Sequence, residues 1–250
     1  MVNNYKVGDL VYDAKIYDGL NKQNDDYLFY LNWFKKNNPG KVLELCCGTG
    51  RLTIPLYENG INITGVDNSI TMLTEAVSKS KGKNITYIQG DMRDFNIEEK
   101  YDAIFIPFNS IHHLYFNEDV IKTFATVKNH LNLKGWFLLD FFNPNIRYIC
   151  ENENKKTKVV EYTTEDGRNV VINQNMKYED YTQINRITWE YIINGKFSSI
   201  ENMDMRMFYP QELDYYLISN GFDIVNKYGD FDQSQFTENS SKQIYICQMK

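Results

Sequence analysis

The sequence predicts an α/β fold built on a mostly parallel sheet, and three observations carry this prediction. Short apolar runs alternate with segments of helical period over residues 1–154. The first apolar run ends in Cys-Cys-Gly-Thr-Gly at residues 46–50. From residue 155 the pattern changes to two-residue alternation with Asp-Gly and Asn-Gly dipeptides. Strands that alternate with helices form parallel sheets covered on both faces, whereas strict alternation is typical of antiparallel strands.

The parallel part begins with a helix, because apolar residues from Tyr27 to Phe34 recur at helical spacing before Pro39-Gly40. Strands and helices then alternate along the chain. The expected strands lie at residues 42–45, 61–67, 85–89, 102–107 and 136–142, with helical patterns at 52–57, 72–77 and 120–131. Two closing strands, at 222–228 and 243–249, follow a helix that Pro210 opens. We therefore expect a seven-stranded, mostly parallel sheet with helices on both faces.

Residues 155–208 predict an inserted antiparallel β-meander. Asp166-Gly167 and Asn194-Gly195 separate its alternating runs, and both dipeptides favour tight hairpin turns. A sheet of this size has little core of its own, so we expect it to pack on the parallel domain. The predicted domains are residues 1–154 with 209–250, and the insertion at 155–208.

Composition excludes several classes of function. A net charge of −6 and a pI near 5.2 disfavour a nucleic-acid partner. The N-terminus lacks the apolar core of a signal peptide, and no apolar run reaches the length of a membrane span. The four cysteines have neither disulfide-framework nor metal-knuckle spacing. We expect a cytoplasmic protein without a metal site or a membrane partner.

The glycine-containing loop is the first candidate binding site. Gly48 and Gly50 allow close approach to the backbone where a strand gives way to a helix. The loop lacks the third glycine of a dinucleotide fingerprint and the lysine of a P-loop. Asp67 ends the second strand, where a carboxylate can accept hydrogen bonds from ribose hydroxyls. Asp91 and Met92 follow the third strand and offer a carboxylate and an apolar side chain to a purine.

These motifs together resemble those of the class I, Rossmann-like S-adenosylmethionine-dependent methyltransferases. The segments that match, in that family's order, are 42–50, 65–69, 90–94, 105–110 and 133–136. The resemblance implies S-adenosyl-L-methionine as cofactor and S-adenosyl-L-homocysteine as product. The cofactor-binding residues that it implies are Tyr17, Glu44, Cys46, Gly48, Thr49, Gly50, Asp67, Asn68, Asp91, Met92, Pro107 and Phe108.

Further segments resemble a small-molecule subgroup of this family. Residues 206–213 and 229–232, with the early Tyr-Asp motifs at 12–18, are similar to those of amino-sugar N,N-dimethyltransferases and glycine N-methyltransferase. In that subgroup an antiparallel insertion roofs the active site and an N-terminal aromatic residue covers the cofactor. The expected substrate-binding residues are Tyr12, Phe142 and Arg206. Arg206 is expected on the exposed polar side of the last meander strand, where it would meet an anionic acceptor group such as a phosphate or carboxylate, or else form a surface ion pair with Asp204 or Glu201.

Methyl transfer from a sulfonium is an in-line displacement, so the protein mainly positions the nucleophile and excludes water. An amine nucleophile must arrive neutral, and a base that works near pH 7 would help. His112 and His113 both follow the fourth strand, near the expected position of the acceptor. His113 is the preferred base of the two, because it lies one residue further into the next helical turn. Asn109 in the same segment is expected to bind cofactor or acceptor. The Asn-Pro-Pro-Tyr signature of base-modifying methyltransferases is absent there.

The sequence therefore predicts a methyltransferase that acts on a small-molecule acceptor, at an amine nitrogen, as a monomer or homodimer. Two alternatives stay open. One is a protein that binds S-adenosylmethionine as a sensor or accessory subunit without methyl transfer. The other is a methyltransferase that acts on a macromolecule, either RNA or protein.

Overall fold

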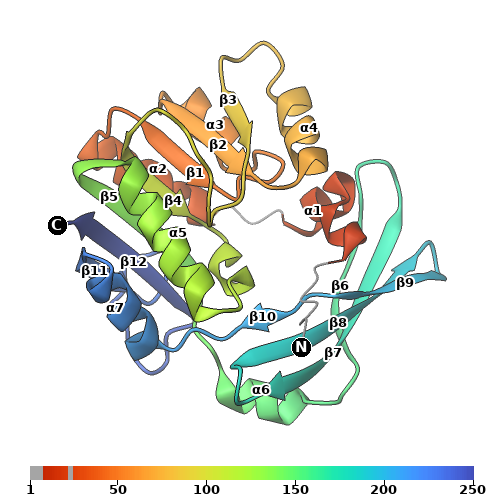
Figure 1. Cartoon of the computed structure of the whole chain (residues 1–250). Coiled ribbons are helices and arrows are strands. Elements are labelled where there is room, and N and C mark those ends of the chain that lie inside the picture. The colour runs from red at the N-terminus through yellow and green to blue at the C-terminus, as the bar shows by residue number, and fades with distance from the viewer. Residues whose placement is uncertain (1–7, 22–24) are drawn as a thin grey trace. The chain divides into compact units, whose positions relative to one another are not determined.

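A computed structural model of the chain describes residues 8–21 and 25–250 (Figure 1). The chain divides into two compact units. One comprises Gln23–Asn143 with Tyr209–Lys250, and the other comprises Met1–Lys22 with Pro144–Phe208.

The first unit is the predicted parallel one. Its strands are β1 (Val42–Leu45), β2 (Ile63–Asp67), β3 (Thr86–Gln89), β4 (Tyr101–Ile106), β5 (Leu131–Phe142), β11 (Phe222–Tyr228) and β12 (Lys242–Met249). They form one seven-stranded sheet in the order β11-β12-β5-β4-β1-β2-β3. β12 runs antiparallel to both of its neighbours, and the remaining pairs are parallel. The predicted fold class is thereby confirmed.

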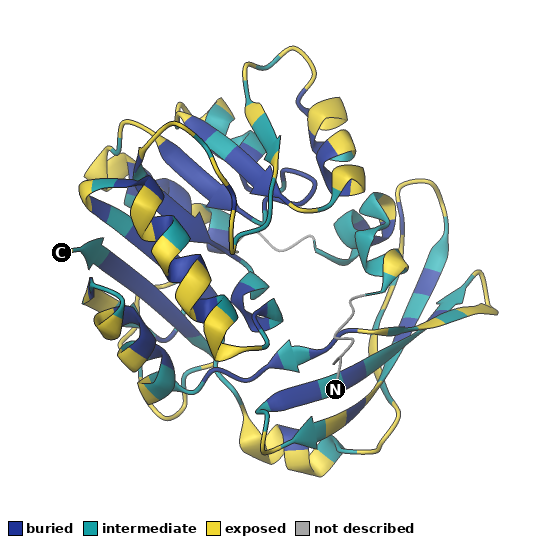
Figure 2. Cartoon of the chain, viewed as in Figure 1, coloured by how far each residue is buried: buried dark blue, intermediate teal, exposed yellow. Residues whose placement is uncertain are grey.

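Helices cover both faces of this sheet. They are α2 (Asp25–Asn37), α3 (Thr53–Glu58), α4 (Ile70–Lys79), η2 (Ser110–His113), α5 (Asn117–His130) and α7 (Pro210–Ser219). Phe34 of α2 packs in one cluster with Leu138 of β5, whereas Phe124 of α5 contacts Phe137, the residue before Leu138, at 5.5 Å between ring centroids. Successive strand residues point to opposite faces, so α2 and α5 lie on opposite sides of the sheet (Figure 1). Buried and exposed residues alternate around α5 accordingly (Figure 2).

Local sequence signals account for most element boundaries. Ser69 caps α4 by accepting a hydrogen bond from the Met72 amide at 3.4 Å. β5 begins at Leu131, earlier than the predicted Trp136, because Leu131 already pairs with Tyr101 of β4. A register irregularity follows that pair, and the apolar pattern of the strand resumes only beyond it.

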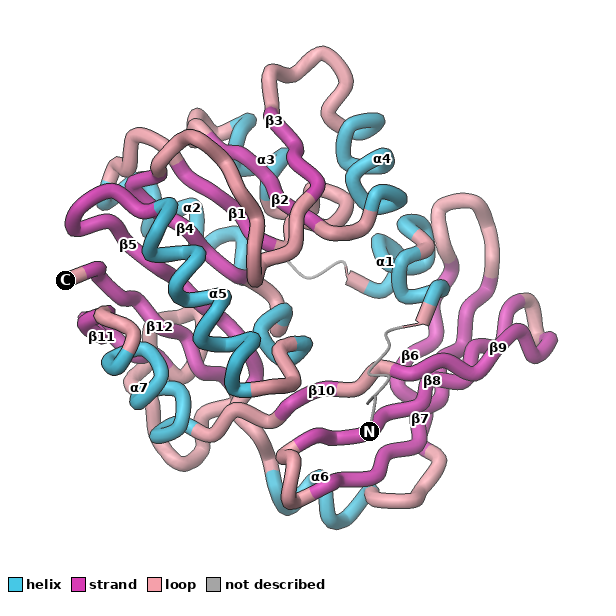
Figure 3. The backbone as a smooth tube through the Cα atoms, viewed as in Figure 1, coloured by secondary structure: helices cyan, strands magenta, loops and turns pink. Residues whose placement is uncertain are grey.

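The second unit contains the predicted meander. Its strands are β6 (Thr157–Thr163), β7 (Asn169–Glu179), β8 (Ile184–Ile193), β9 (Lys196–Asn202) and β10 (Met205–Arg206). They pair in the order β10-β8-β7-β6, and β9 also pairs with β8. β7 and β8 run side by side along their length (Figure 3). Asn194 and Gly195 turn between β8 and β9 with φ values of 51° and 73°, which confirms the hairpin predicted from Asn-Gly.

This sheet has a core that the sequence interpretation did not assign to it. The helices η1 (Asp9–Tyr12), α1 (Ala14–Leu20) and α6 (Ile146–Asn152) belong to the same unit. Ile16 of α1 is 1% exposed and packs with Val170, Ile172 and Tyr191 of β7 and β8. The Tyr162 hydroxyl on β6 donates to the Ile16 carbonyl at 2.8 Å. The N-terminal helices thus cover part of the apolar face of the meander.

The observed units differ from the predicted domains at their boundaries. The second unit resumes at Pro144 instead of residue 155, and it includes Met1–Lys22, which the sequence analysis grouped with the parallel domain. The second unit ends at Phe208 and the first resumes at Tyr209. The physical reason for the N-terminal difference is the core around Ile16, whose partners are separated from it by more than a hundred residues and leave no local signal.

Within residues 8–21 and 25–250, no helix is long and apolar enough to cross a membrane.

Phe105 on β4 tests the core of the parallel unit. Its side chain is fully buried, and its ring lies 4.6 Å from that of Tyr30 and 5.4 Å from that of Phe34. We expect Phe105→Ala to lower the free energy of unfolding by about 3–5 kcal/mol, because the cavity adds to the lost burial. Urea unfolding followed by circular dichroism measures this change. Leu133→Ala, at an 81% exposed position, is the control, with an expected change within about 0.5 kcal/mol; equal losses in both variants would contradict the packing described.

Candidate functional site

The predicted residues of the parallel unit gather at one edge of its sheet. They follow the carboxyl ends of β1, β2, β3, β4 and β5, and these ends meet at the same edge because the strands are parallel. β1 lies between β2 and β4, so the strand order reverses beside it. Ligands of open α/β sheets bind outside the carboxyl ends at such a reversal.

The loop between β1 and α3 has the backbone that its composition predicts. Cys46, Gly48 and Gly50 have φ values of 60°, 54° and 80°. A Cβ atom at Gly50 would lie 3.0 Å from the Ile54 side chain and from the Tyr87 hydroxyl. Glycine is therefore required at position 50 by both conformation and space. Thr49 between the glycines is fully buried.

Asp67, at the end of β2, holds this loop. One carboxylate oxygen accepts a hydrogen bond from the Gly48 amide at 2.8 Å, and the other accepts one from the Ser69 amide at 2.9 Å. Burial raises the pKa of Asp67, although these backbone donors oppose the effect. A carboxylate oxygen can accept more than one hydrogen bond, so Asp67 keeps capacity for ribose hydroxyls. Neighbouring Asn68 is exposed, and its carbonyl accepts from the Gln89 side chain at 3.2 Å.

Glu44 fixes the other end of the loop. It is 2% exposed, and its carboxylate accepts a 2.6 Å hydrogen bond from the hydroxyl of Thr53, the first residue of α3. Burial raises the pKa of Glu44 to about 8, against the opposing effects of the Thr53 hydrogen bond and the Arg51 charge. Glu44 thus connects β1 to α3.

The segment after β3 supplies Asp91 and Met92. Burial alone would raise the pKa of Asp91, but hydrogen bonds from the Arg93 guanidinium and amide lower it. The Met92 sulfur lies 3.7 Å from the Cys46 sulfur, which brings the predicted adenine side next to the glycine loop. Burial raises the pKa of the Cys46 thiol far above neutrality, so this cysteine is not a reactive thiolate.

The loop after β4 is held in an unusual conformation. Pro107 is buried, and Phe108 and Asn109 have φ values of 55° and 66°. The Asn109 side-chain oxygen accepts a 2.8 Å hydrogen bond from the Phe142 amide on β5. The Arg51 guanidinium lies 4.4 Å from the centroid of the Phe108 ring. One face of this ring therefore already contacts a cation, a contact that the sequence analysis did not foresee.

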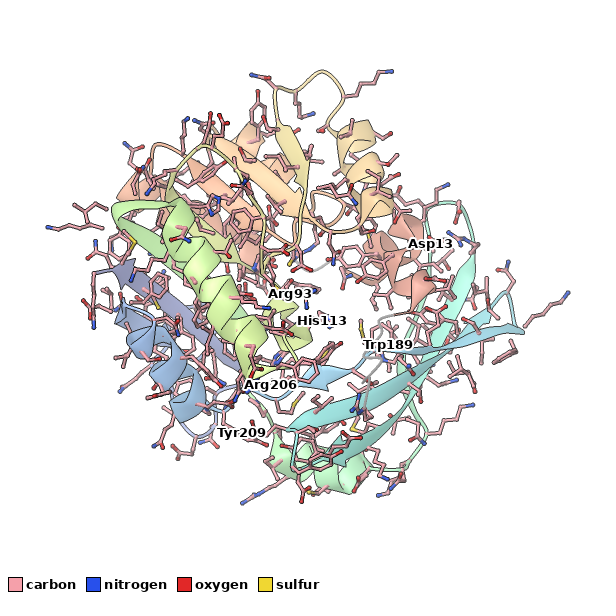
Figure 4. The ribbon with its side chains drawn as sticks, in the orientation of Figure 1. Asp13, Arg93, His113, Trp189, Arg206 and Tyr209 are labelled. Atoms are coloured by element: carbon pink, nitrogen blue, oxygen red, sulfur yellow. The ribbon has the colours of Figure 1, made fainter. Side chains whose placement is uncertain are left out.

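The two predicted histidines differ in their surroundings. His112 is fully buried, and its ring stacks on that of Phe142 with 4.0 Å between centroids. His113 is half-buried, and its Nδ1 lies 3.4 Å from the Tyr115 hydroxyl. The side chains of Arg93 and His113 come from the segments after β3 and β4 (Figure 4). Of the two histidines, His113 is the more accessible to a proton.

Tyr12, Tyr17 and Arg206 lie in the other unit, on η1, α1 and β10. Their predicted contacts with cofactor and substrate stay predictions. The placement of Arg206 on an exposed polar strand side was wrong, because Arg206 is 3% exposed and its guanidinium lies 4.7 Å from the centroid of the Phe208 ring. β9 ends at Asn202 and β10 begins at Met205, so the alternation expected across residues 202–207 is interrupted.

Sequence reasoning missed three charged or polar residues at this edge. Arg51 forms a two-point ion pair with Asp26, which is itself 3% exposed. Asp140 near the end of β5 is also 3% exposed and accepts hydrogen bonds from the Tyr30 hydroxyl and the Phe108 amide. A single acid inside the apolar run 136–142 was the available signal.

Comparison with known proteins agrees with this geometry. Residues 42–135 match the family described as a methyltransferase domain. The chain is 36% identical to the protein YqeM of Bacillus subtilis (strain 168) over 131 residues, which are 51% of this chain and 53% of that one. The match thus spans about half the length of that relative. The chain is also 27% identical to a glycine/sarcosine N-methyltransferase of Aphanothece halophytica over 227 residues, covering 88% of this chain and 80% of the relative.

Solved structures show the same fold. An S-adenosylmethionine-dependent methyltransferase from Clostridium acetobutylicum ATCC 824 superimposes with a TM-score of 0.81 at 22% identity, covering 97% of this chain and 99% of that one. The amino pentose methyltransferase CalS10 from Micromonospora echinaspora, with bound S-adenosylmethionine, gives a TM-score of 0.73 at 18% identity, covering 96% and 97%.

The fold is that of the class I, Rossmann-like methyltransferases, and the matches support S-adenosyl-L-methionine as the cofactor. The chain is similar over most of its length to enzymes named as a glycine/sarcosine N-methyltransferase and an amino pentose methyltransferase.

The buried Glu44 makes stability depend on pH. Its folded-state pKa of about 8 exceeds the unfolded value of about 4.3, so the folded state holds this proton more tightly and stability falls as pH rises between the two values. We expect Glu44→Gln, which cannot ionise, to gain stability relative to the wild type by a few kcal/mol between about pH 5 and about pH 9. Urea unfolding at both pH values measures the difference. Glu98→Gln at an exposed position is the control; a constant difference for Glu44→Gln across the range would contradict the raised pKa.

Proposed function

We propose that this chain transfers a methyl group from S-adenosylmethionine to the amine nitrogen of a small-molecule acceptor. The observation that carries the proposal is Asp67, whose carboxylate holds the Gly48 amide at the strand-order reversal while keeping capacity for a diol. The choice of an amine rests on the similarity to glycine/sarcosine and amino pentose methyltransferases.

The residues of the parallel unit suit this cofactor. Asp67 would hold the ribose hydroxyls, the glycine loop the methionyl part, and Asp91 with Met92 the adenine. The bound cofactor supplies an electrophilic methyl group on a positively charged sulfur. The buried Asp67 and the partly buried Asp91 place negative charge beside the loop, which favours a cationic ligand. Glu44, with its pKa raised to about 8 by burial, is largely protonated at neutral pH and adds little to this charge.

The chain's part in the reaction is positioning and proton transfer. Pro107 and Phe108 would line the reacting centre and exclude water, which aligns the acceptor for in-line attack. An amine at neutral pH arrives largely as ammonium and must lose a proton before it attacks. Imidazole exchanges protons in this pH range, and the half-buried His113 is the group that we propose for this step.

The two alternatives make different predictions. A sensor or accessory protein would bind S-adenosylmethionine without forming S-adenosylhomocysteine, whatever acceptor is offered. A macromolecular methyltransferase would methylate RNA or protein, and the net charge of −6 disfavours RNA. We propose a cytoplasmic location, because the composition and isolated cysteines fit a reducing compartment.

Asp67→Ala tests the cofactor site. We expect it to weaken S-adenosylmethionine binding by about 10- to 100-fold, because it removes charged hydrogen bonds to ribose and the anchor of the Gly48 amide. Isothermal titration calorimetry with S-adenosylmethionine and S-adenosylhomocysteine measures the affinities. Asp94→Ala, which removes an exposed carboxylate, is the matched control. Absence of binding by the folded wild type would overturn the proposed function.

Methyl transfer is tested by incubating the full chain with S-adenosylmethionine and glycine, sarcosine or an aminopentose nucleotide. Formation of S-adenosylhomocysteine and of the methylated amine, measured by mass spectrometry, is the expected result with at least one of them. His113→Gln should then lower turnover most near neutral pH, where a neutral imidazole can accept the proton of an acceptor that is still largely ammonium, and less at acidic pH, where the imidazole is itself protonated. Binding of the cofactor without turnover on any small amine, protein or RNA would favour the sensor alternative.

A further inference from the structure

Asp140 is a buried acid to which the proposed chemistry gives no role. It lies two residues before the end of β5, in an otherwise apolar run, and is 3% exposed. Its carboxylate accepts a 2.6 Å hydrogen bond from the Tyr30 hydroxyl on α2. It also accepts the Phe108 amide, at 3.1 Å from each oxygen. A carboxylate removed from water is destabilising unless it is fully hydrogen-bonded, so the burial of an acid at this position calls for a structural or functional reason.

The groups that Asp140 binds belong to one short segment. Phe108 and Asn109 are consecutive non-glycine residues with positive φ, a conformation that L residues rarely adopt. The Asp140 carboxylate accepts the first amide and the Asp140 carbonyl accepts the second, at 3.1 Å. The Asn109 side chain then returns to β5 by accepting the Phe142 amide. Both strained residues are thus held by hydrogen bonds to residues 140–142.

The opposite side of the segment is fixed as well. The Arg51 guanidinium lies over the Phe108 ring and is itself held by the buried Asp26. Phe108 is therefore restrained at its ring by the glycine loop and at its amide by β5. Backbone strain that is maintained in this way concentrates at functional sites.

We propose that Asp140 is a positioning residue, which holds Phe108 and Asn109 in the conformation required for methyl transfer. The inference rests on the proposed function, since this segment is the one expected to line the reacting centre. Tyr30 supports it by orienting the carboxylate. The other charged groups that act on Asp140 are Asp26 on α2 and Lys242 on β12.

A test that needs no acceptor uses nuclear magnetic resonance on the full, isotope-labelled chain. Burial raises the pKa of Asp140 to about 6, so the Phe108 amide resonance should shift with pH around that value. In Asp140→Asn this titration should be lost, and the Phe108 and Asn109 amides should exchange faster with solvent while the Leu43 amide in β1 does not. Persistence of the titration in Asp140→Asn, or unchanged exchange of both amides, would overturn the inference.

Asp102→Asn is the matched control. Asp102 also lies on a strand of this sheet and also accepts a backbone amide, that of Lys41 at 2.9 Å, but at the amino end of β4. It should leave the Phe108 titration unchanged. Tyr30→Phe keeps the Phe108 hydrogen bonds and removes one that lowers the pKa of Asp140. It should move the titration midpoint upward even if Asp140→Asn does not fold, and an unmoved midpoint would count against the inference.

Kinetics separate this inference from the proposed function. With sarcosine as the probe acceptor, Asp140→Asn should lower kcat by about tenfold to a hundredfold, as expected for a misplaced reacting group. The affinity for S-adenosylmethionine should fall less than kcat does, because the Asp67 and glycine-loop contacts remain. Wild-type kcat in Asp140→Asn would overturn the inference while leaving the function intact. Absence of turnover in the wild type would weaken the function alone, and the amide titration would then decide the inference.

Discussion

The arrangement of this site depends on buried carboxylates that hold backbone and side-chain donors at the edge of a parallel sheet. Glu44 holds the start of α3, Asp67 holds Gly48, and Asp140 holds Phe108. Loops at a sheet edge are free to adopt many conformations unless their polar groups are bound from within. Carboxylates suit this task because they accept several hydrogen bonds in fixed directions. Burial disfavours the charged form of a carboxyl group, and it raises the pKa of all three acids for this reason.

These acids also determine the electrostatics of the edge. The cation that contacts the site from within, Arg51, is already paired with Asp26. The net charge of the remaining groups at this edge is negative, which suits a ligand that carries a permanent positive charge at its reacting atom. Structural and functional demands therefore coincide, since the groups that order the loops also favour a sulfonium over a neutral nucleoside.

The sequence predicted the parallel unit well because its signals are local. The strand periodicity, the glycines at 48 and 50 and the acid at 67 each lie within a few residues of the element that they define. Asp140 and Arg51 were missed because their partners, Tyr30 and Asp26, lie on α2 and are brought near only by the folded sheet. The burial of Arg206 was missed for a similar reason, since the residue pattern continues across the break between β9 and β10 and does not reveal it. Tertiary contacts of this kind have no periodicity to detect.

The packing of Ile16 against β7 and β8 has a consequence for how the chain is made. Residues 8–21 are synthesised well before their partners Val170, Ile172 and Tyr191. In the other unit, β5 pairs with β12, which follows it by about a hundred residues. The apolar side chains of α1 and β5 therefore stay uncovered during part of elongation, until their distant partners have been made. Chaperones that bind exposed apolar surface can act on the nascent chain during that interval.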